Sequence, residues 1–268
     1  MIDLHCHLLP GIDDGSPDEA TSLEMARIAV ADGIRTTACT PHIYPGLYPN
    51  TKEGILAAIA SFREALAAEN IPLRLVEGAD THLAPDLAGQ IKAGKIPTLN
   101  GSRYFLFEPP HHVAPPRLED TVFSLLAAGL IPVITHPERL TWLNDQHYPM
   151  FQRMVLSGAW MQLTAGSVTG HFGKRPQHWA ERILDDGLCH ILATDARHIS
   201  RRRPVLSEAR DRVALRLGEQ EALHLVFTRP SGILQNLSPA ALPALPAARH
   251  DSRPIHYFWK GLFGKMRQ

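Results

Sequence analysis

The hydrophobic pattern of the chain alternates between short apolar runs and longer amphipathic stretches. The short runs predict seven strands, over residues 2–6, 34–40, 73–80, 104–108, 131–136, 160–166 and 189–196. Apolar residues at helical spacing predict helices between them, over residues 16–33, 50–70, 117–129, 145–157, 175–187 and 205–218. Ser16 is expected to cap the first helix, and Asn50 or Thr51 the second. Strands that alternate with helices imply βαβ units and a parallel sheet.

Histidines and carboxylates follow these strands at or just past their C-terminal ends. They are His5, His7, His42, Asp80, His82, Glu108, His136 and Asp195. In a (β/α) barrel the C-terminal ends of all strands converge on one face, whereas an open doubly wound sheet offers a crevice at one switch point. The pattern therefore favours a single-domain (β/α)7 TIM-like barrel over an open sheet.

Composition and charge narrow the classes of function. The chain has 268 residues, enough for one sizeable core, and 15 of them are histidine. Lys plus Arg and Asp plus Glu both number 27, which gives a formal net charge of zero. We expect no nucleic-acid partner, because such binding normally needs a basic surface.

Cysteine usage and hydropathy favour a cytoplasmic protein. The three cysteines are odd in number and form no CxxC pair, which predicts neither a disulfide framework nor a zinc ribbon. No signal peptide is recognised, and no apolar run approaches the ~18 residues that span a bilayer.

A change in composition near residue 237 predicts the end of the barrel domain at residue 236. Residues 237–268 are rich in Pro and Ala and then end in "IHYFWKGLFGKMRQ", an aromatic and basic segment. This loose tail either docks peripherally on the inner face of a membrane or on a partner, or packs against the barrel. An oligomer is a further option.

The opening stretch "MIDLHCHLLPGIDDG" holds the strongest chemical signal. His5 and His7 are two residues apart on a strand, so both imidazoles can reach one ion. Asp14 follows in a turn, where Gly15 permits the bend. His42, Asp80, Glu108, His136 and Asp195 then recur at later strand ends, and together they predict a metal centre.

The ligand types indicate the metal and the chemistry. A mixture of nitrogen and oxygen ligands without a thiolate favours Mn, Fe or Zn, and so many ligands suggest more than one ion. Two ions ~3.5–4 Å apart can activate water and stabilise an oxyanion, as phosphoester hydrolysis requires. Arg139 and the run Arg201–Arg203 can hold a phosphoryl group. Because the sequence shows no Walker loop, nucleophile elbow or cysteine-phosphatase loop, the nucleophile is expected to be metal-activated water.

These motifs resemble the PHP (polymerase and histidinol phosphatase) superfamily, and more closely its CpsB/YwqE-type protein-tyrosine phosphatases. The resemblance extends in order from the opening stretch through "TPHIYPGLY", "EGADTHL", "FLFEPP", "THPER" and "ATDARHISRRRP". It implies a distorted (β/α)7 barrel with a trinuclear, usually Mn-dependent, centre, and we expect two or three ions in this chain. It also implies a phosphotyrosine substrate on the tail of a tyrosine kinase that controls capsule or exopolysaccharide synthesis.

The resemblance also implies which residues would bind each ion. One ion takes His5, His7, Asp80 and Asp195, and a second shares Asp80 and adds Glu108 and His136. A third takes Asp14, His42 and a histidine two residues after Asp195. Arg139 and one arginine of the run, for which Arg203 is chosen, would hold the phosphate, and His42 would also take part in catalysis.

Two positions depart from the family pattern. Asp80 replaces the usual Glu, and its shorter side chain puts a bridging role in doubt. The last motif is usually Asp-x-His, but here Arg197 stands two residues after Asp195 and His198 follows it. We favour His198 as the third-site ligand. The other interpretation is a weak third site, with Arg197 supplying positive charge in place of the ion.

Two alternatives to the tyrosine phosphatase stay open. One is a PHP phosphatase acting on a small molecule such as histidinol phosphate. The other is a degenerate barrel that binds a kinase tail without turnover, which the departures at Asp80 and Arg197 motivate.

Overall fold

All seven predicted strands are present in the computed structural model, which describes residues 1–246. They are β1 (Ile2–Cys6), β2 (Thr36–Cys39), β5 (Arg74–Glu77), β7 (Tyr104–Glu108), β8 (Ile131–Thr135), β9 (Trp160–Thr164) and β10 (Ile191–Ala193). Two of them continue after a break, β2 as β3 (His42–Tyr44) and β5 as β6 (Asp80–His82). His42 and Asp80, which directly follow these breaks, therefore still lie on strands of the barrel.

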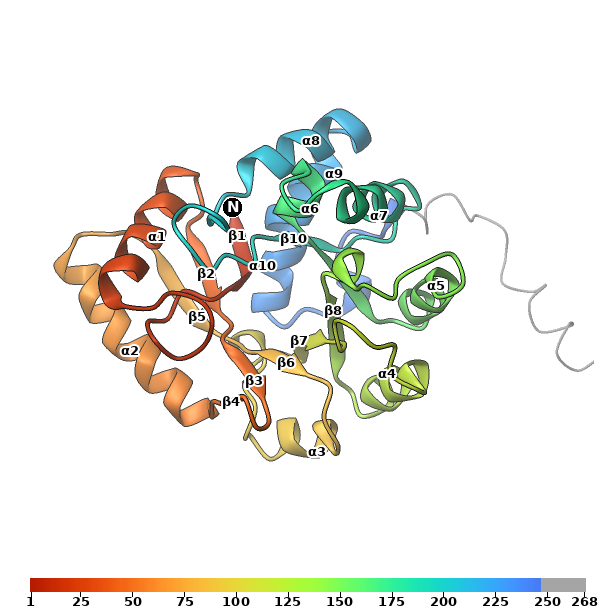
Figure 1. Ribbon diagram of the computed structural model, residues 1–268, viewed down its shortest axis with the longest axis horizontal. Helices are drawn as coiled ribbons and strands as arrows, with labels where there is room; N and C mark the ends of the chain where they lie inside the picture. Colours follow the sequence, from red (N-terminus) through yellow and green to blue (C-terminus); the bar gives the residue numbers. More distant parts are fainter. Residues whose placement is uncertain (247–268) are drawn as a thin grey trace, which may run out of the picture.

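The predicted helices are also present, and they surround the strands (Figure 1). The longer ones are α1 (Glu19–Ala31), α2 (Lys52–Ala68), α4 (Leu118–Ala127), α5 (Tyr148–Leu156), α7 (Lys174–Asp185) and α8 (Ser207–Leu217). Short ones are α3 (Leu87–Lys92), α6 (Ala165–Thr169), α9 (Glu219–Leu223) and α10 (Arg229–Leu234). Thr51 caps α2 as predicted, with its hydroxyl accepting from Gly54 N–H at 3.2 Å. The prediction of Ser16 as the α1 cap is wrong, because the Asp18 carboxylate accepts from Thr21 N–H at 2.8 Å.

The strands form a distorted barrel rather than one closed sheet. One sheet has the order β1-β2-β5, and the other has the order β10-β9-β8-β7-β6-β3-β4, where β4 is the short strand Tyr48–Pro49. All neighbours are parallel except β3 and β4. Beyond β10 the chain joins β1, since Asp195 N–H donates to His5 O at 2.8 Å and His7 N–H donates to Ala196 O at 2.9 Å. The predicted (β/α)7 class is confirmed, with the distortion at the two broken strands.

Two hydrophobic clusters build the core. The larger one lies between the strands and the surrounding helices. The smaller one fills the interior of the barrel with inward side chains of successive strands, including Leu4, Ala38, Val76, Leu106, Val133 and Ile191. Such a filled interior leaves the C-terminal ends of the strands as the place where polar groups can gather.

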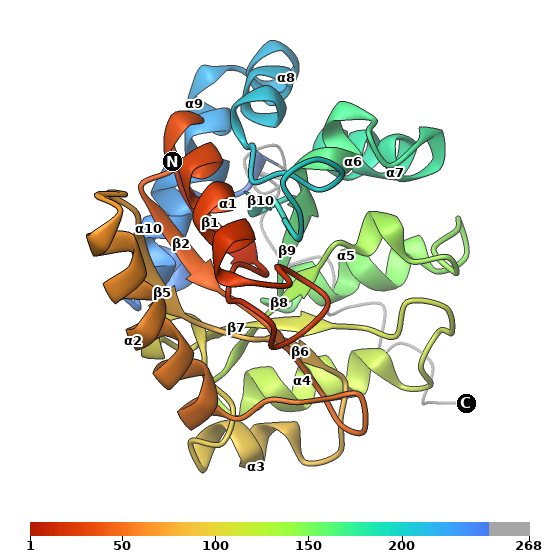
Figure 2. The same ribbon diagram turned by 60° about the vertical axis from the view of Figure 1, so that its left-hand side comes forward.

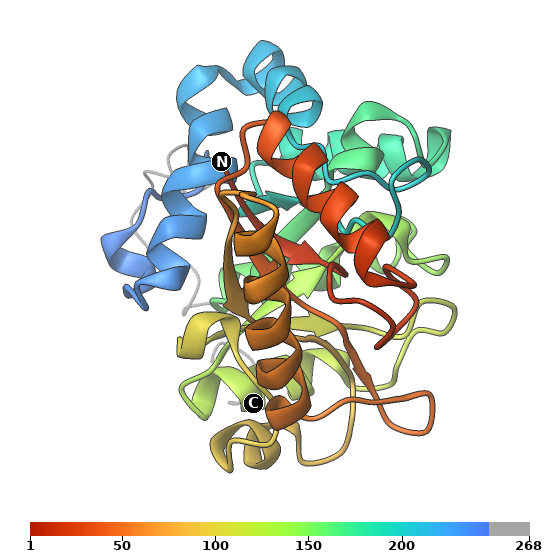
Figure 3. The same cartoon turned by 90° about the vertical axis from the view of Figure 1, so that its left-hand side faces the viewer.

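Helix α10 lies at the opposite end of the strands from the loop that follows β1 (Figures 2 and 3). Helix α10 packs against β1, and its Ile233 joins the interior cluster. Residues 237–246 contact the same end, because Tyr104 donates to Leu237 O at 2.9 Å and Leu242 packs against the cluster. The part of the predicted loose tail that is described is thus packed. The aromatic and basic segment lies outside the described residues, and the boundary at 236 stays a prediction.

A buried arginine fastens this segment to the body. Arg229 is fully buried, and its guanidinium pairs with Glu221 at 2.6 Å. The same guanidinium donates to Pro243 O and Ala244 O, both at 3.1 Å. Within residues 1–246, no helix is both long and apolar enough to cross a membrane.

We expect Arg229→Met to lower the free energy of unfolding by about 3–5 kcal/mol, because it removes the cation that faces a buried carboxylate. The matched control is Arg153→Met, whose exposed pair with Glu119 is expected to contribute ~1 kcal/mol or less. Urea unfolding monitored by circular dichroism measures both. Equal losses in the two variants would contradict a stabilising role for the buried pair.

Candidate metal centre

The predicted ligands meet at the C-terminal mouth of the barrel, with His198 as the exception. Their ligand atoms form four overlapping groups, in each of which the atoms lie within 4.8 Å of one another. The groups are His5–His7–Asp80, His5–His136–Asp195, His7–Asp14–His42 and His42–Asp80–Glu108. Asp80 belongs to two groups, so its short side chain still reaches both sides of the centre.

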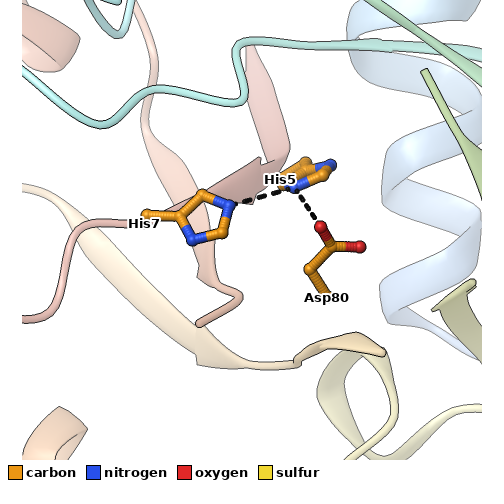
Figure 4. A group of neighbouring side chains, drawn as sticks. All are labelled: His5, His7 and Asp80. Carbon is orange, nitrogen blue, oxygen red and sulfur yellow. Dashed lines mark hydrogen bonds and ion pairs between the residues drawn. The ribbon is translucent and has the colours of Figure 1, made fainter. Parts of the chain in front are cut away.

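A bulge in β1 directs the first two histidines inward. Against β2, β1 advances by three residues from Asp3 to Cys6 where β2 advances by two. Leu4 faces the apolar interior, and the extra residue turns His5 and His7 to that same side. Figure 4 shows the result: His5 Nε2 lies 3.3 Å from His7 Nε2 and 3.3 Å from Asp80 Oδ2.

Partners behind these histidines fix their orientation. His5 Nδ1 lies 2.9 Å from Gln162 Oε1, and His7 Nδ1 lies 2.6 Å from Asp13 Oδ2. Both rings therefore present Nε2 to the centre, which is how metal-ligating histidines are usually held. Sequence reasoning missed these roles of Gln162 and Asp13. The signal for Gln162 was a polar residue inside an otherwise apolar strand.

The turn Asp13–Gly15 packs closely against His7. Asp13 also accepts from His42 N–H at 3.0 Å, which ties the first turn to β3. Gly15 is required there, because a Cβ at this position would lie 2.3 Å from His7 O. Burial opposes ionisation of Asp13, but its contact with His7 and the N–H groups that donate to it lower its pKa to about 2. Asp13 thus stays an acceptor that points His7 at the centre.

The electrostatics of the centre call for a cation. Burial favours neutral His5, yet Asp80 and Asp195 raise its pKa to about 9. Burial also disfavours ionised Asp80, but the charge on His5 holds the pKa of that carboxyl well below its usual range. Burial and Asp80 raise the pKa of Glu108. An ion bound here would displace the proton of His5 and satisfy the same carboxylates.

Unsatisfied polar atoms lie around Asp80, and they test whether the residues fit a metal. Among the described residues, the buried atoms without a hydrogen-bond partner include His42 Nδ1, both Asp80 oxygens and both ring nitrogens of His136. Burying such atoms unpaired is costly. His42 Nδ1 lies 3.5 Å from Asp80 Oδ2 and 3.5 Å from Glu108 Oε2. This donor set fits a divalent ion with nitrogen and oxygen ligands.

Two ligands have a strained backbone. His136 has a φ of 33° and Asp195 a φ of 47°, the left-handed region that side-chain-bearing residues rarely adopt. Such strain costs ~1–3 kcal/mol and persists where the surroundings impose it. Next to Asp195, Asp3 restrains the preceding residue, Thr194. The Asp3 carboxylate accepts from Thr194 N–H at 3.0 Å and from Thr194 Oγ at 2.5 Å.

Three arginines surround Asp195. Arg139 and Arg202 contact its Oδ2, and Arg197 Nε lies 3.3 Å from its Oδ1. Burial disfavours the charged form, but these guanidinium groups, led by Arg202, hold the pKa of Asp195 well below its usual range. The Arg139 and Arg202 guanidinium carbons lie 5.0 and 5.7 Å from the centroid of the Phe172 ring. A cleft of about 190 Å³ lined by Phe172 and Arg202 opens beside them.

The structure differs from the sequence prediction at two candidate positions. His198 is not brought to the other ligands: its Nδ1 accepts from Ser200 N–H at 3.1 Å on the surface. The reason is that Arg197, and not His198, occupies the space between Asp14 and Asp195. Arg203 is exposed and lines the cleft, whereas Arg202 reaches Asp195. Sequence position alone could not show which of two neighbouring side chains points toward Asp195, because the turn that carries them is irregular.

Comparison with known proteins supports the resemblance. The family model described as "Capsular polysaccharide synthesis, CpsB/CapC" matches residues 1–235. The tyrosine-protein phosphatase YwqE of Bacillus subtilis is 36% identical over 78% of this chain and 82% of its own length. The tyrosine-protein phosphatase CpsB of Streptococcus pneumoniae is 27% identical over 88% of this chain and 99% of its own length.

Solved structures agree with the sequence comparison. A crystal structure reported for YwqE and CpsB, described as unique metal-dependent tyrosine phosphatases, superposes with a TM-score of 0.83 at 33% identity, covering 89% of this chain and 96% of that one. A β-aspartyl dipeptidase from Fervidobacterium islandicum, at 12% identity and a TM-score of 0.52 over 87% of this chain and 72% of its own, shares the fold alone. The predicted family is confirmed, and the chain belongs to the CpsB/CapC family of capsular polysaccharide synthesis.

Proposed function

We propose that this protein is a metal-dependent phosphatase that hydrolyses phosphotyrosine. The observation that carries the proposal is a set of buried imidazole and carboxylate ligands around Asp80, bordered by Arg139 and Arg202 at an open mouth. The names of the relatives point to the same activity.

The ligand geometry supports a centre with two ions, for which we propose Mn, with Fe or Zn as other options. His5, His7 and Asp80 would hold one ion, with Asp195 Oδ1 facing both histidines. Asp80, Glu108 and His42 would hold the other, with His136 Nε2 3.8 Å from Glu108 Oε1. Ions bound there would polarise a phosphoryl group and make water more acidic.

Residues of this chain would bind and orient the substrate. The planar guanidinium groups of Arg139 and Arg202 can donate paired hydrogen bonds to phosphoryl oxygens. Their contact with Phe172 holds them at the mouth. Gln162 and Asp13 keep the His5 and His7 rings in place, and the depressed pKa of Asp195 keeps its carboxylate charged.

The rim of the mouth suits an aryl phosphate. Tyr48 stacks on His42 with ring centroids 5.5 Å apart, and the partly exposed Tyr44 stacks on His82 at 4.0 Å. Aromatic side chains at an opening favour an aromatic group in the substrate. We therefore propose phosphotyrosine on the tail of a tyrosine kinase of capsule or exopolysaccharide synthesis, which places the protein in the cytoplasm near the membrane.

A phosphotyrosyl peptide is expected to be hydrolysed with a kcat/KM well above that for histidinol phosphate. The reason is that the arginines and the aromatic rim are accessible from outside. Phosphate release is measured with protein treated with EDTA, with and without added Mn²⁺. Activity restricted to histidinol phosphate would favour the small-molecule phosphatase, and no turnover with full metal occupancy would favour the kinase-binding barrel.

Mn²⁺ at a hundred times its dissociation constant is expected to stabilise the metal-free protein by about 2.7 kcal/mol for each ion bound. For a protein of this size, that corresponds to a rise in Tm of roughly 5–10 °C. Asp80→Asn should lose most of the rise because Asp80 belongs to two ligand groups. His198→Ala is the control and should keep it. Differential scanning fluorimetry measures all three, and an unchanged rise in Asp80→Asn would place the metal elsewhere.

Arg139→Ala and Arg202→Ala are each expected to raise KM for an aryl phosphate by roughly tenfold or more, since a hydrogen bond to a charged group contributes ~1.5–3 kcal/mol. Arg203→Ala, in the same run but without contact to Asp195, should change KM much less. Steady-state kinetics and elemental analysis test this. Loss of bound metal in the Arg139 or Arg202 variant would instead assign that arginine to holding Asp195.

A further inference from the structure

Arg197 lies inside the ligand cluster rather than on the surface. Its side chain is about 10% exposed, and its Nη1 contacts Asp14 Oδ1. Its Nε lies 3.3 Å from Asp195 Oδ1, so the guanidinium bridges two carboxylates. The backbone holds it there, because Arg197 N–H donates to Arg202 O at 3.0 Å.

The guanidinium stays charged in this position. A guanidinium is effectively always protonated in proteins, and this one contacts the carboxylates of both Asp195 and Asp14. The other cations around Asp195, Arg139 and Arg202, lie on its Oδ2 side, away from Asp14. Arg197 is therefore the fixed positive charge on the Asp14 side of the centre.

The group His7–Asp14–His42 differs from the two groups that contain Asp80. In the two groups that contain Asp80, three buried atoms have no hydrogen-bond partner, namely His42 Nδ1 and both Asp80 oxygens. On the other side, His7 Nε2 contacts His5 and Asp195, and Asp14 contacts Arg197. The carboxylate that an ion would need here already has a cation of its own.

We propose that the Arg197 guanidinium takes the place of a metal ion in the group His7–Asp14–His42, so that the centre binds two ions and one fixed organic cation. This rests on the metal centre of the proposed function. A divalent ion at Asp14 would be repelled by a guanidinium that contacts the same carboxylate. Arg197 cannot leave by deprotonation, whereas a histidine at the same position could become a neutral ligand.

The proposal assigns different tasks to the two sides of the mouth. The Asp80 side takes the ions and the chemistry they supply. On the Asp14 side, Arg197 supplies positive charge and hydrogen-bond donors but no exchangeable coordination position. Whether a metal ion binds on this side then depends on the residue at position 197 and not on the concentration of the ion.

The test is the number of Mn²⁺ ions bound per chain, measured by equilibrium dialysis against saturating Mn²⁺ and elemental analysis. We expect two ions in the wild-type protein and three in Arg197→His, which removes the fixed charge and adds a nitrogen ligand. Arg203→His is the matched control, because it makes the same change at an exposed arginine outside the cluster, and it should bind two. Circular dichroism confirms that each variant is folded.

Asp14→Asn keeps the proposal testable if Arg197→His does not fold. The variant should still bind two ions, because Asp14 holds a guanidinium and no metal. Three ions in the wild-type protein, a fall in the count in Asp14→Asn, or a count of two in folded Arg197→His would each overturn the assignment of Arg197. One ion or none in the wild-type protein would instead overturn the two-ion centre of the proposed function.

Discussion

The burial of Asp80 and Asp195 at the mouth of the barrel is the constraint on which the rest of the site depends. Both carboxylates are fully buried, and ionised carboxylates in such a place require compensating cations or a shift to the neutral form. The chain keeps them ionised, with a high pKa for His5 and three guanidinium groups around Asp195. In the proposed centre, metal ions would complete this compensation on the Asp80 side, where both carboxylate oxygens and His42 Nδ1 are left without hydrogen bonds.

The same strands carry the apolar interior of the barrel along most of their length and the polar candidate site at their C-terminal ends. Inward side chains form an apolar layer that α10 and residues 237–246 close at one end, and the next inward positions along the strands are the candidate ligands. On β1 this continuity depends on the bulge, which turns His5 to the side that Leu4 faces. A strand without the extra residue would direct His5 and His7 toward the helices instead. The site therefore depends on an irregularity in the barrel and not on its ideal geometry.

The three arginines at the mouth contact different parts of the candidate site. Arg139 and Arg202 share contacts with Asp195 and with Phe172, so they are held where a phosphoryl group can reach them. Arg197 points the other way, toward Asp14. Guanidinium and metal ions compete for carboxylates but offer different chemistry, since only the ion can acidify water. In the proposed site, the positions of three like side chains would therefore decide where ions bind and where substrate charge is held.

The sequence by itself determined the strand and helix order and the barrel class, and it placed nearly all candidate ligands at strand ends, because hydrophobic periodicity and position at strand ends are local properties. His5, Asp80, Glu108 and His136 were singled out in this way, and the structure brings their side chains together. Tertiary structure alone decided that Arg197 and not His198 enters the cluster, and that Arg202 and not Arg203 reaches Asp195. In the irregular turn after β10 no fixed period links residue number to side-chain direction. Contacts with Asp14 and Asp195, distant in sequence, select which side chain points inward.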